Sequence, residues 1–312
     1  MKIRGLLLAG LMLGVSSFAY LKAYAGGTKS APPPAAGQLF SKPVRASSLT
    51  TDSGARNRET LDVAAAHKEA SAGAAHADAT CTSGSVASGV YSNLNIAGTC
   101  FIDAGSVTVE HNLTVLSGEN LIAIFGGSDV MVGGNIVVEA NGVLILGCEP
   151  IHFICANDPD QTVGSLSTAD TVGGNLTSES ALAVIVHATI IGRNVSLNGG
   201  GGGVSCIPSP VLGGSPPFTD SEDVTIGGNL TITGLQTCFI GVFRNTITQN
   251  FVLNGNVDAD PDGNELADNS IVHNLNCAGN SPSPQIGDSG GGPSTVFGRA
   301  NGQCNNPTLV QH

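Results

Sequence analysis

Short runs of alternating apolar and polar residues flank a recurrent Asn between residues 81 and 280. The segment Val224-Thr-Ile-Gly-Gly-Asn-Leu-Thr-Ile232 is one copy of this unit. With the Asn as position zero, positions −3 and +1 are apolar in every copy, and position +3 departs clearly only at Ser178. A period of two is typical of β-strands. The unit occurs eight times, centred on Asn93, Asn112, Asn135, Asn175, Asn194, Asn229, Asn250 and Asn274.

The residue pair before each Asn indicates a bend in the chain at this point. The pairs include Gly-Gly, Glu-His, Gly-Arg and Thr-Gln. Asn tolerates the left-handed conformation that a sharp bend requires. Equivalent bends would stack the Asn side chains, and stacked amides hydrogen-bond to one another. We therefore expect an inward-pointing Asn ladder, and we interpret the glycosylation sequons at Asn112, Asn175, Asn194 and Asn229 as accidental.

The spacing of the Asn residues predicts a solenoid. Successive Asn residues are 19, 23, 40, 19, 35, 21 and 24 positions apart. The gap of 40 fits two coils, and the gap of 35 fits one coil plus an insertion. A period near 20 with several short strands is typical of a parallel β-solenoid. About ten coils, each rising ~4.8 Å, would extend roughly 45 Å.

With this pattern the chain resembles the right-handed parallel β-helix proteins of the pectate-lyase-like group, whose coils carry an Asn ladder at a tight bend. The resemblance covers residues 81–280 and is one of architecture. The chain is also similar to a group of secreted bacterial proteins of unknown function. That second resemblance rests on the segments Gly-Gly-Asn-Leu, Gly-Cys-Glu-Pro, Asp-Pro-Asp-Gly-Asn-Glu and Gly-Asp-Ser-Gly-Gly, and it implies no activity.

The two ends differ in composition from the repeat. Residues 1–25 have the features of a signal peptide: charged Lys2 and Arg4, an apolar stretch, and the small-residue cleavage site Ala23-Tyr24-Ala25. Residues 26–80 are rich in Ala, Pro and Ser and predict a disordered linker. Residues 81–280 would form the β-helix, and residues 281–312 would cap it. The chain is therefore expected to be secreted and to have no membrane segment after cleavage of the signal peptide.

All eight Cys residues follow residue 80. An even number of Cys residues behind a signal peptide is typical of disulfides. Because residues near in sequence lie near one another along a solenoid, we expect local pairs. These are Cys81–Cys100, Cys148–Cys155, Cys206–Cys238 and Cys277–Cys304.

Acidic residues dominate the predicted β-helix. From Cys81 onward, only Arg193, Arg244 and Arg299 are basic, against 19 Asp and Glu residues. Such a surface repels nucleic acid and anionic membranes. Solubility outside the cell is the simpler interpretation of this charge.

Two segments interrupt the repeat. Residues 148–168 contain Cys148-Glu-Pro150 and predict a bridged loop. Residues 199–223 begin with five Gly residues and then carry four Pro residues. Pro cannot donate to a β-ladder, so this segment predicts a long excursion. Binding residues often lie on such loops, but the loop can equally be a tolerated insertion.

The segment Asp258-Ala-Asp260-Pro-Asp262-Gly-Asn-Glu265 is the best candidate for a metal site. Oxygen ligands at positions 1, 3 and 5 with Gly at position 6 match the first half of a calcium-binding loop. Position 12 is Asn269 instead of the expected Glu, and Asp268 precedes it. We consider Ca²⁺ binding by Asp258, Asp260, Asp262, Glu265 and Asp268, with an acidic turn between coils as the alternative.

The sequence contains no recognisable catalytic constellation. The leading hypothesis is a secreted, non-enzymatic protein that is structural or that binds polysaccharide or another cell-surface component. The alternative is a polysaccharide lyase or glycoside hydrolase on a β-helix scaffold. That alternative requires carboxylates and Arg244 to converge in a groove. The sequence does not indicate an oligomeric state.

Overall fold

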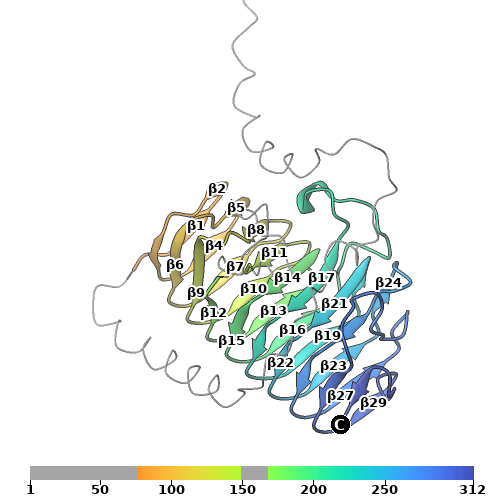
Figure 1. Ribbon diagram of the computed structural model, residues 1–312. Helices are drawn as coiled ribbons and strands as arrows, with labels where there is room; N and C mark the ends of the chain where they lie inside the picture. The colour runs from red at the N-terminus through yellow and green to blue at the C-terminus, as the bar shows by residue number, and fades with distance from the viewer. Residues whose placement is uncertain (1–75, 149–167) are drawn as a thin grey trace, which may run out of the picture. The chain divides into compact units, whose positions relative to one another are not determined.

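The computed structural model describes residues 76–148 and 168–312. In this part the chain winds as a right-handed parallel β-helix, and its strands form three long parallel sheets (Figure 1). We call them sheets A, B and C, in the order in which each coil passes through them. The predicted fold class and the expectation of about ten coils are confirmed, because sheet A contains ten strands.

The strands of each sheet stack in sequence order. Sheet A consists of β1 (Ala79–Cys81), β4 (Leu94–Ile96), β7 (Leu113–Val115), β10 (Ile136–Val138), β13 (Leu176–Glu179), β16 (Val195–Asn198), β19 (Leu230–Thr233), β23 (Phe251–Asn254), β27 (Leu275–Ala278) and β29 (Ala300–Gly302). Sheet B consists of β2 (Gly84–Ser85), β5 (Thr99–Phe101), β8 (Asn120–Ala123), β11 (Val143–Leu146), β14 (Ala183–His187), β17 (Phe218–Glu222), β21 (Phe239–Phe243) and β25 (Glu265–Ala267). Sheet C consists of β3 (Gly89–Tyr91), β6 (Gly105–Val109), β9 (Ser128–Val132), β12 (Asp170–Val172), β15 (Thr189–Ile191), β18 (Thr225–Ile226), β22 (Thr246–Ile247), β26 (Ser270–Ile271), β28 (Ser294–Val296) and β30 (Val310–Gln311). Two short strands, β20 (Gln236–Thr237) and β24 (Val257–Asp258), pair between sheets A and B.

The interior of the coils is filled by the apolar positions of the repeat. In one coil, Ile226, Leu230 and Ile232 are all fully buried. Position −3 ends a strand of sheet C and position +1 begins a strand of sheet A, so the predicted bend at the Asn is confirmed. The first coil is an exception at position −3, because Tyr91, and not Val90, is in register with the buried Val109.

The predicted Asn ladder runs along this corner through all eight copies. Each Asn Oδ1 accepts the backbone N–H of the next Asn at 2.9–3.2 Å. From Asn112 to Asn250, each Oδ1 also accepts a hydrogen bond from the Nδ2 of the next Asn. Beyond the last copy, Asn274 Oδ1 accepts the backbone N–H of Arg299 at 3.1 Å.

Two details of the predicted ladder were wrong. None of the eight side chains is buried, because positions −3, +1 and +3 occupy the interior and leave position zero at the outer corner. None of the eight has a positive φ either. The Gly residues before the Asn serve close packing: a Cβ at Gly174 would lie 2.5 Å from Asn135 Oδ1. The interpretation of the sequons as accidental assumed that the Asn side chains point inward. That assumption is wrong, because these side chains lie at the outer corner.

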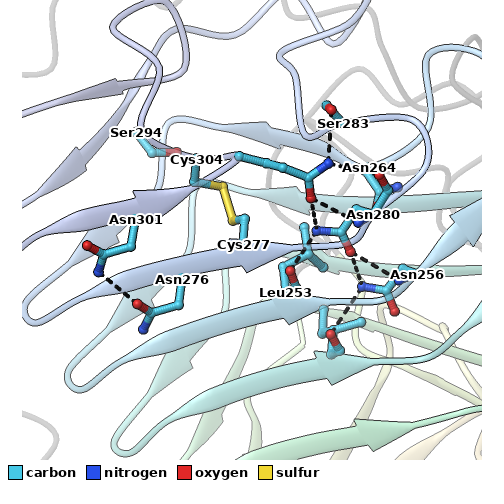
Figure 2. Close-up of a disulfide and its surroundings, with 12 residues drawn as sticks. Leu253, Asn256, Asn264, Asn276, Cys277, Asn280, Ser283, Ser294, Asn301 and Cys304 are labelled. Atoms are coloured by element: carbon cyan, nitrogen blue, oxygen red, sulfur yellow. Dashed lines mark hydrogen bonds between the residues drawn. A yellow bond between two sulfur atoms is a disulfide. The ribbon is translucent and has the colours of Figure 1, made fainter.

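Two shorter polar ladders lie inside the coils, and the sequence analysis missed both. Between sheets A and B, Asn256 donates its Nδ2 to Asn280 Oδ1 at 3.0 Å, and Asn280 donates to Gln303 Oε1 at 3.1 Å (Figure 2). Between sheets B and C, Asn245 donates to Asn269 Oδ1 at 3.2 Å. These Asn side chains are 0–6% exposed. They satisfy buried backbone groups where the chain turns.

The two longest gaps in the repeat are both single coils with insertions. Strand β10 pairs directly with β13, and Asn175 bonds directly to Asn135. The gap of 40 is therefore one coil and not two. The gap of 35 is one coil plus the predicted excursion, which carries the 3-10 helix η2 (Pro210–Leu212). The five Gly residues that begin this excursion all have positive φ.

From β8 to β25, sheet B is covered on its outer face, unlike most of sheets A and C. Strands β14 and β21 are buried at every position, whereas sheet A alternates buried and half-buried residues. Leu212 of the excursion packs against Val143 and Ala183, and Ile286 packs near Phe239. The outer face of sheet B thus forms a second, smaller core.

The β-helix extends beyond the boundary predicted at residue 280. Strands β28, β29 and β30 continue sheets C and A, so residues 294–311 add strands to the stack. The predicted signal peptide, most of the linker, and Cys155 lie outside the described residues. Among the described residues, no helix is long and apolar enough to cross a membrane.

Candidate functional site

Three of the predicted disulfides are present in the structure. Cys81–Cys100 joins the first two coils, and Cys206–Cys238 holds the excursion against sheet B. Cys277–Cys304 joins β27 to the segment that follows β29 (Figure 2). Cys148 is also disulfide-bonded, but its predicted partner lies outside the described residues. Three disulfides in one chain indicate an oxidising environment.

A shallow groove of about 600 Å³ lies on the outer face of sheet A, across β16, β19, β23 and β27. Its polar lining consists of amide and hydroxyl side chains, and no charged residue contributes. The ladder forms one side of it, and outward positions of the strands form its floor. The lining residues are Asn194, Val195, Ser196, Asn229, Thr231, Asn250, Val252 and Asn276.

A cluster of ionisable side chains lies on the covered outer face of sheet B. His187 ends β14 and is in register with Glu222, which ends β17. Asp220 lies two residues before Glu222 and therefore points to the same face. The side chains of His187, Asp220 and Glu222 are 0–2% exposed. We call these three residues the sheet B cluster.

The cluster is held together by short polar contacts. His187 Nε2 lies 3.2 Å from Asp220 Oδ2. Arg244, at the next corner, donates Nη2 to Glu222 Oε2 at 2.6 Å and Nε to Asp223 Oδ2 at 2.9 Å. Arg244 and Asp223 reach the surface, with side chains 28% and 23% exposed. Both have a positive φ, of 55°, at equivalent corners of neighbouring coils.

Burial dominates the protonation of the cluster. It raises the pKa of Asp220 to about 7 and, together with the charge of Asp220, raises the pKa of Glu222 to about 8. Burial lowers the pKa of His187, so the imidazole is neutral at physiological pH. At neutral pH this environment therefore favours the uncharged forms of Glu222 and His187, whereas Asp220 is about half ionised.

The carboxylates predicted as calcium ligands fall into three places. Asp258 ends β24 and lies beside Asp260, whose Oδ1 accepts the backbone N–H of Asp262 at 3.1 Å. Glu265 begins β25 on the outer face of sheet B, near Asp288.

Asp268 lies at the corner after β25, and its carboxylate accepts the backbone N–H of Gly292 at 3.0 Å. Asn269, at position 12 of the motif, belongs to an inner ladder. The structure therefore brings Asp258 close to Asp260 but does not gather all five carboxylates around one point.

Two of these carboxylates are buried with unpaired oxygens. Asp258 is 7% exposed and Glu265 is 1% exposed, and their oxygens make no hydrogen bond of good geometry, although the backbone N–H groups of Asn264 and Asp288 lie nearby. Burial raises the pKa of Asp258 to about 8 and that of Glu265 to about 9; the nearby Asp260 and Asp288 add to these shifts. Ca²⁺ binding at this segment stays a prediction.

Sequence reasoning missed the sheet B cluster. Among the described residues, His187, Asp220 and Glu222 form the one group of three such side chains that could share a metal ion. The residues come from two coils separated by the excursion, so no short motif contains them. The available signal was charge inside apolar strands, as in Ala183-Val-Ile-Val-His187 and Phe218-Thr-Asp-Ser-Glu222.

Comparison of the chain with family models, curated proteins and solved structures gives no match.

Proposed function

We propose that this chain is a secreted, non-enzymatic binding protein that holds a polysaccharide of the cell surface against sheet A. The observation that carries the proposal is the uncharged groove across β16, β19, β23 and β27. Hydroxyl and amide groups both donate and accept hydrogen bonds, as sugar hydroxyls do. Three disulfides in a chain with an apparent signal peptide support a location outside the cell.

The repetition of the coils favours a linear polymer as ligand. Each coil presents an equivalent ladder amide about 4.8 Å from the previous one, so a polymer along the solenoid axis would meet the same chemistry at each step. An amide nitrogen carries two hydrogens, and the ladder uses one of them. The resemblance of the coil pattern to pectate-lyase-like β-helices also favours a polysaccharide.

The acidic charge of the chain limits the choice of polymer. Its formal net charge is −12, but the groove lining is uncharged. A neutral polysaccharide can approach this groove without electrostatic repulsion, whereas a highly anionic one requires bridging cations.

The enzymatic alternative has one observation in its favour. Glu222, Asp223 and Arg244 converge, with Asp220 beside them, as a catalytic site would require. However, Asp220 and Glu222 are 1% and 2% exposed, and a polymer could not reach them in this conformation. This burial favours binding without cleavage.

A glycan-array measurement on the full chain, with Ca²⁺ and with chelator, tests the proposal. The matched variants are Thr231→Arg in the groove and Thr114→Arg in the same outward row, four coils earlier. Both Thr side chains are half-buried at the middle of sheet A strands.

We expect Thr231→Arg to weaken binding at least tenfold and Thr114→Arg to leave it unchanged, with equal melting temperatures for the two variants. Binding that survives Thr231→Arg would contradict the proposed site. Cleavage of a bound glycan that Asp220→Asn abolishes would support the enzymatic alternative instead.

A further inference from the structure

The sheet B cluster has the geometry of a metal site. The ligand atoms of His187, Asp220 and Glu222 all lie within 4.8 Å of one another. Two ligand atoms ~2.1 Å from a tetrahedral Zn²⁺ lie about 3.4 Å apart. The distance of 3.2 Å between His187 Nε2 and Asp220 Oδ2 is close to this value. In the absence of an ion, the same distance is that of a hydrogen bond between the two side chains.

Two carboxylate oxygens of the cluster have no hydrogen-bond donor. Asp220 Oδ1 and Glu222 Oε1 are both buried and accept no hydrogen bond from a donor group, although the two carboxyls lie near enough to share a proton. The second oxygen of Glu222 is already bonded to Arg244 Nη2. One oxygen toward a metal and the other toward an outer-shell donor is a common arrangement of carboxylate ligands. Arg244 would thus orient Glu222, and Asp223 would in turn hold Arg244.

The surroundings of the cluster exclude solvent. Ile185, Phe239 and Phe243 are buried around it on the same face. Gly241 is in register with Asp220, and a Cβ there would lie 2.5 Å from Asp220 Oδ1. The missing side chain therefore leaves room for the Asp220 carboxylate.

Charge balance supplies an independent argument. When ionised, Asp220, Glu222 and Asp223 carry three negative charges, and Arg244 carries one positive charge. Among the described residues, the remaining two negative charges equal the charge of one divalent cation. Buried carboxylates are costly unless they are paired or coordinate a metal.

We propose that His187, Asp220 and Glu222 bind one divalent transition-metal cation that stabilises the covered face of sheet B. An imidazole ligand together with two carboxylates suits Zn²⁺ and related ions better than Ca²⁺ or Mg²⁺. The site is separate from the groove on sheet A and from the acidic segment at residues 258–268. It does not depend on polysaccharide binding.

Zinc titration of the full chain, with its disulfides formed and its metals removed by chelator, tests this proposal. We expect one Zn²⁺ per chain and a rise in melting temperature on binding. The isosteric variant Glu222→Gln should weaken binding by at least about tenfold and abolish the rise. The control is the double variant His111→Ala with His273→Ala, which removes two exposed imidazoles and should bind as the wild type does.

X-ray absorption at the zinc edge of the loaded wild type gives a result that does not depend on the folding of a variant. One imidazole nitrogen and a shell of oxygen atoms are expected around the ion. Two or more imidazoles would assign the ion to surface His residues and overturn the proposal. Absence of stoichiometric binding by the wild type, or equal binding by Glu222→Gln, would overturn it as well.

Discussion

Gly241 lies in register opposite Asp220 across β17 and β21, and a Cβ at Gly241 would come within 2.5 Å of Asp220 Oδ1. The same Cβ would lie 2.5 Å from a ring carbon of Phe243 and 2.8 Å from one of Phe239. The two rings stack with centroids 6.4 Å apart. A single Gly therefore permits a carboxylate to lie between aromatic side chains on a covered sheet face.

Gly241→Ala is expected to destabilise the protein by about 1–3 kcal/mol, because the neighbours of the new methyl group are buried and cannot move freely. Urea unfolding measures the change. Gly234→Ala is the comparison: nothing lies within 4 Å of its Cβ, but its φ is +67°. Its cost should be limited to about 1 kcal/mol of backbone strain. A Gly241→Ala variant as stable as the wild type would contradict the close packing described here.

The inner and outer ladders should respond differently to loss of an amide. Asn256→Ala removes the acceptor of the buried Leu235 N–H, whereas Asn194→Ala removes that of Asn229 at the outer corner. Water can replace the lost bond only at the outer corner. We expect Asn256→Ala to cost about 2–3 kcal/mol and Asn194→Ala about 1 kcal/mol. Chemical denaturation of both variants tests the order, and equal costs would mean that water reaches the inner ladder.

The Cys277–Cys304 disulfide is expected to stabilise the C-terminal coil. It closes a loop with a sequence separation of 27 residues, for which the chain-entropy estimate is about 3–4 kcal/mol. In the variant with both residues changed to Ser, we expect limited proteolysis to cut within residues 278–312 at sites that stay intact in the wild type. The double Ser variant of Cys81 and Cys100 is the control and should leave that segment protected. If no new cut appeared in that segment, the last coil would be held without the disulfide.

Asp170 should make stability depend on pH. Burial raises its pKa to about 7 from 3.8, although its Oδ1 accepts the backbone N–H of Val130 at 2.6 Å. Between these two pH values the folded state holds a proton that the unfolded state has lost. The contribution of Asp170 to stability therefore falls as pH rises from 4 to 7 and stays constant above 7.

Asp170→Asn should thus be as stable as the wild type near pH 4 and more stable at pH 8, by at most about 4 kcal/mol. Melting temperatures at both pH values measure this difference. Asp103→Asn changes an exposed carboxylate and should show no such divergence. A parallel pH profile for Asp170→Asn and wild type would show that the residue is ionised in the fold.

The predicted calcium segment can be tested through its buried carboxylate. If Ca²⁺ binds beside Asp258, millimolar Ca²⁺ should raise the melting temperature of the wild type, because only the folded state binds it. Asp258→Asn should remove this increase, and Asp103→Asn should retain it. An unchanged wild-type melting temperature would favour the alternative of an acidic turn. The Asp258→Asn variant should then be more stable than the wild type at pH 9, because the substitution removes a buried charge.

The sequence predicted the features that recur in every coil. With the exception of Val90 in the first coil, the apolar residues at positions −3, +1 and +3 lie inside, and the outer ladder joins equivalent residues such as Asn194 and Asn229. Such features follow from the two-residue period of a strand and from a fixed coil length. The direction of the ladder side chains was predicted wrongly, because period alone does not show on which side of a corner a residue lies.

The local disulfides were also predictable, because neighbouring coils bring nearby Cys residues together. In a solenoid, residues that are close in sequence also lie close together along the axis. The pairs Cys81–Cys100 and Cys277–Cys304 follow from that relation. The coil count across Asn135 and Asn175 was not predictable, since a gap of 40 residues fits two coils as well as one coil with an insertion.

Only the tertiary structure showed that sheet B is covered and that His187, Asp220 and Glu222 meet beneath that cover. The register between β14 and β17 places His187 beside Glu222 although 35 positions separate them. The pairing of strands between these coils depends on where the excursion at residues 199–223 leaves the stack and rejoins it. No local sequence pattern indicates these two points. The repeat therefore determines the scaffold, while long-range register and the covering segments determine which of its polar residues are buried together.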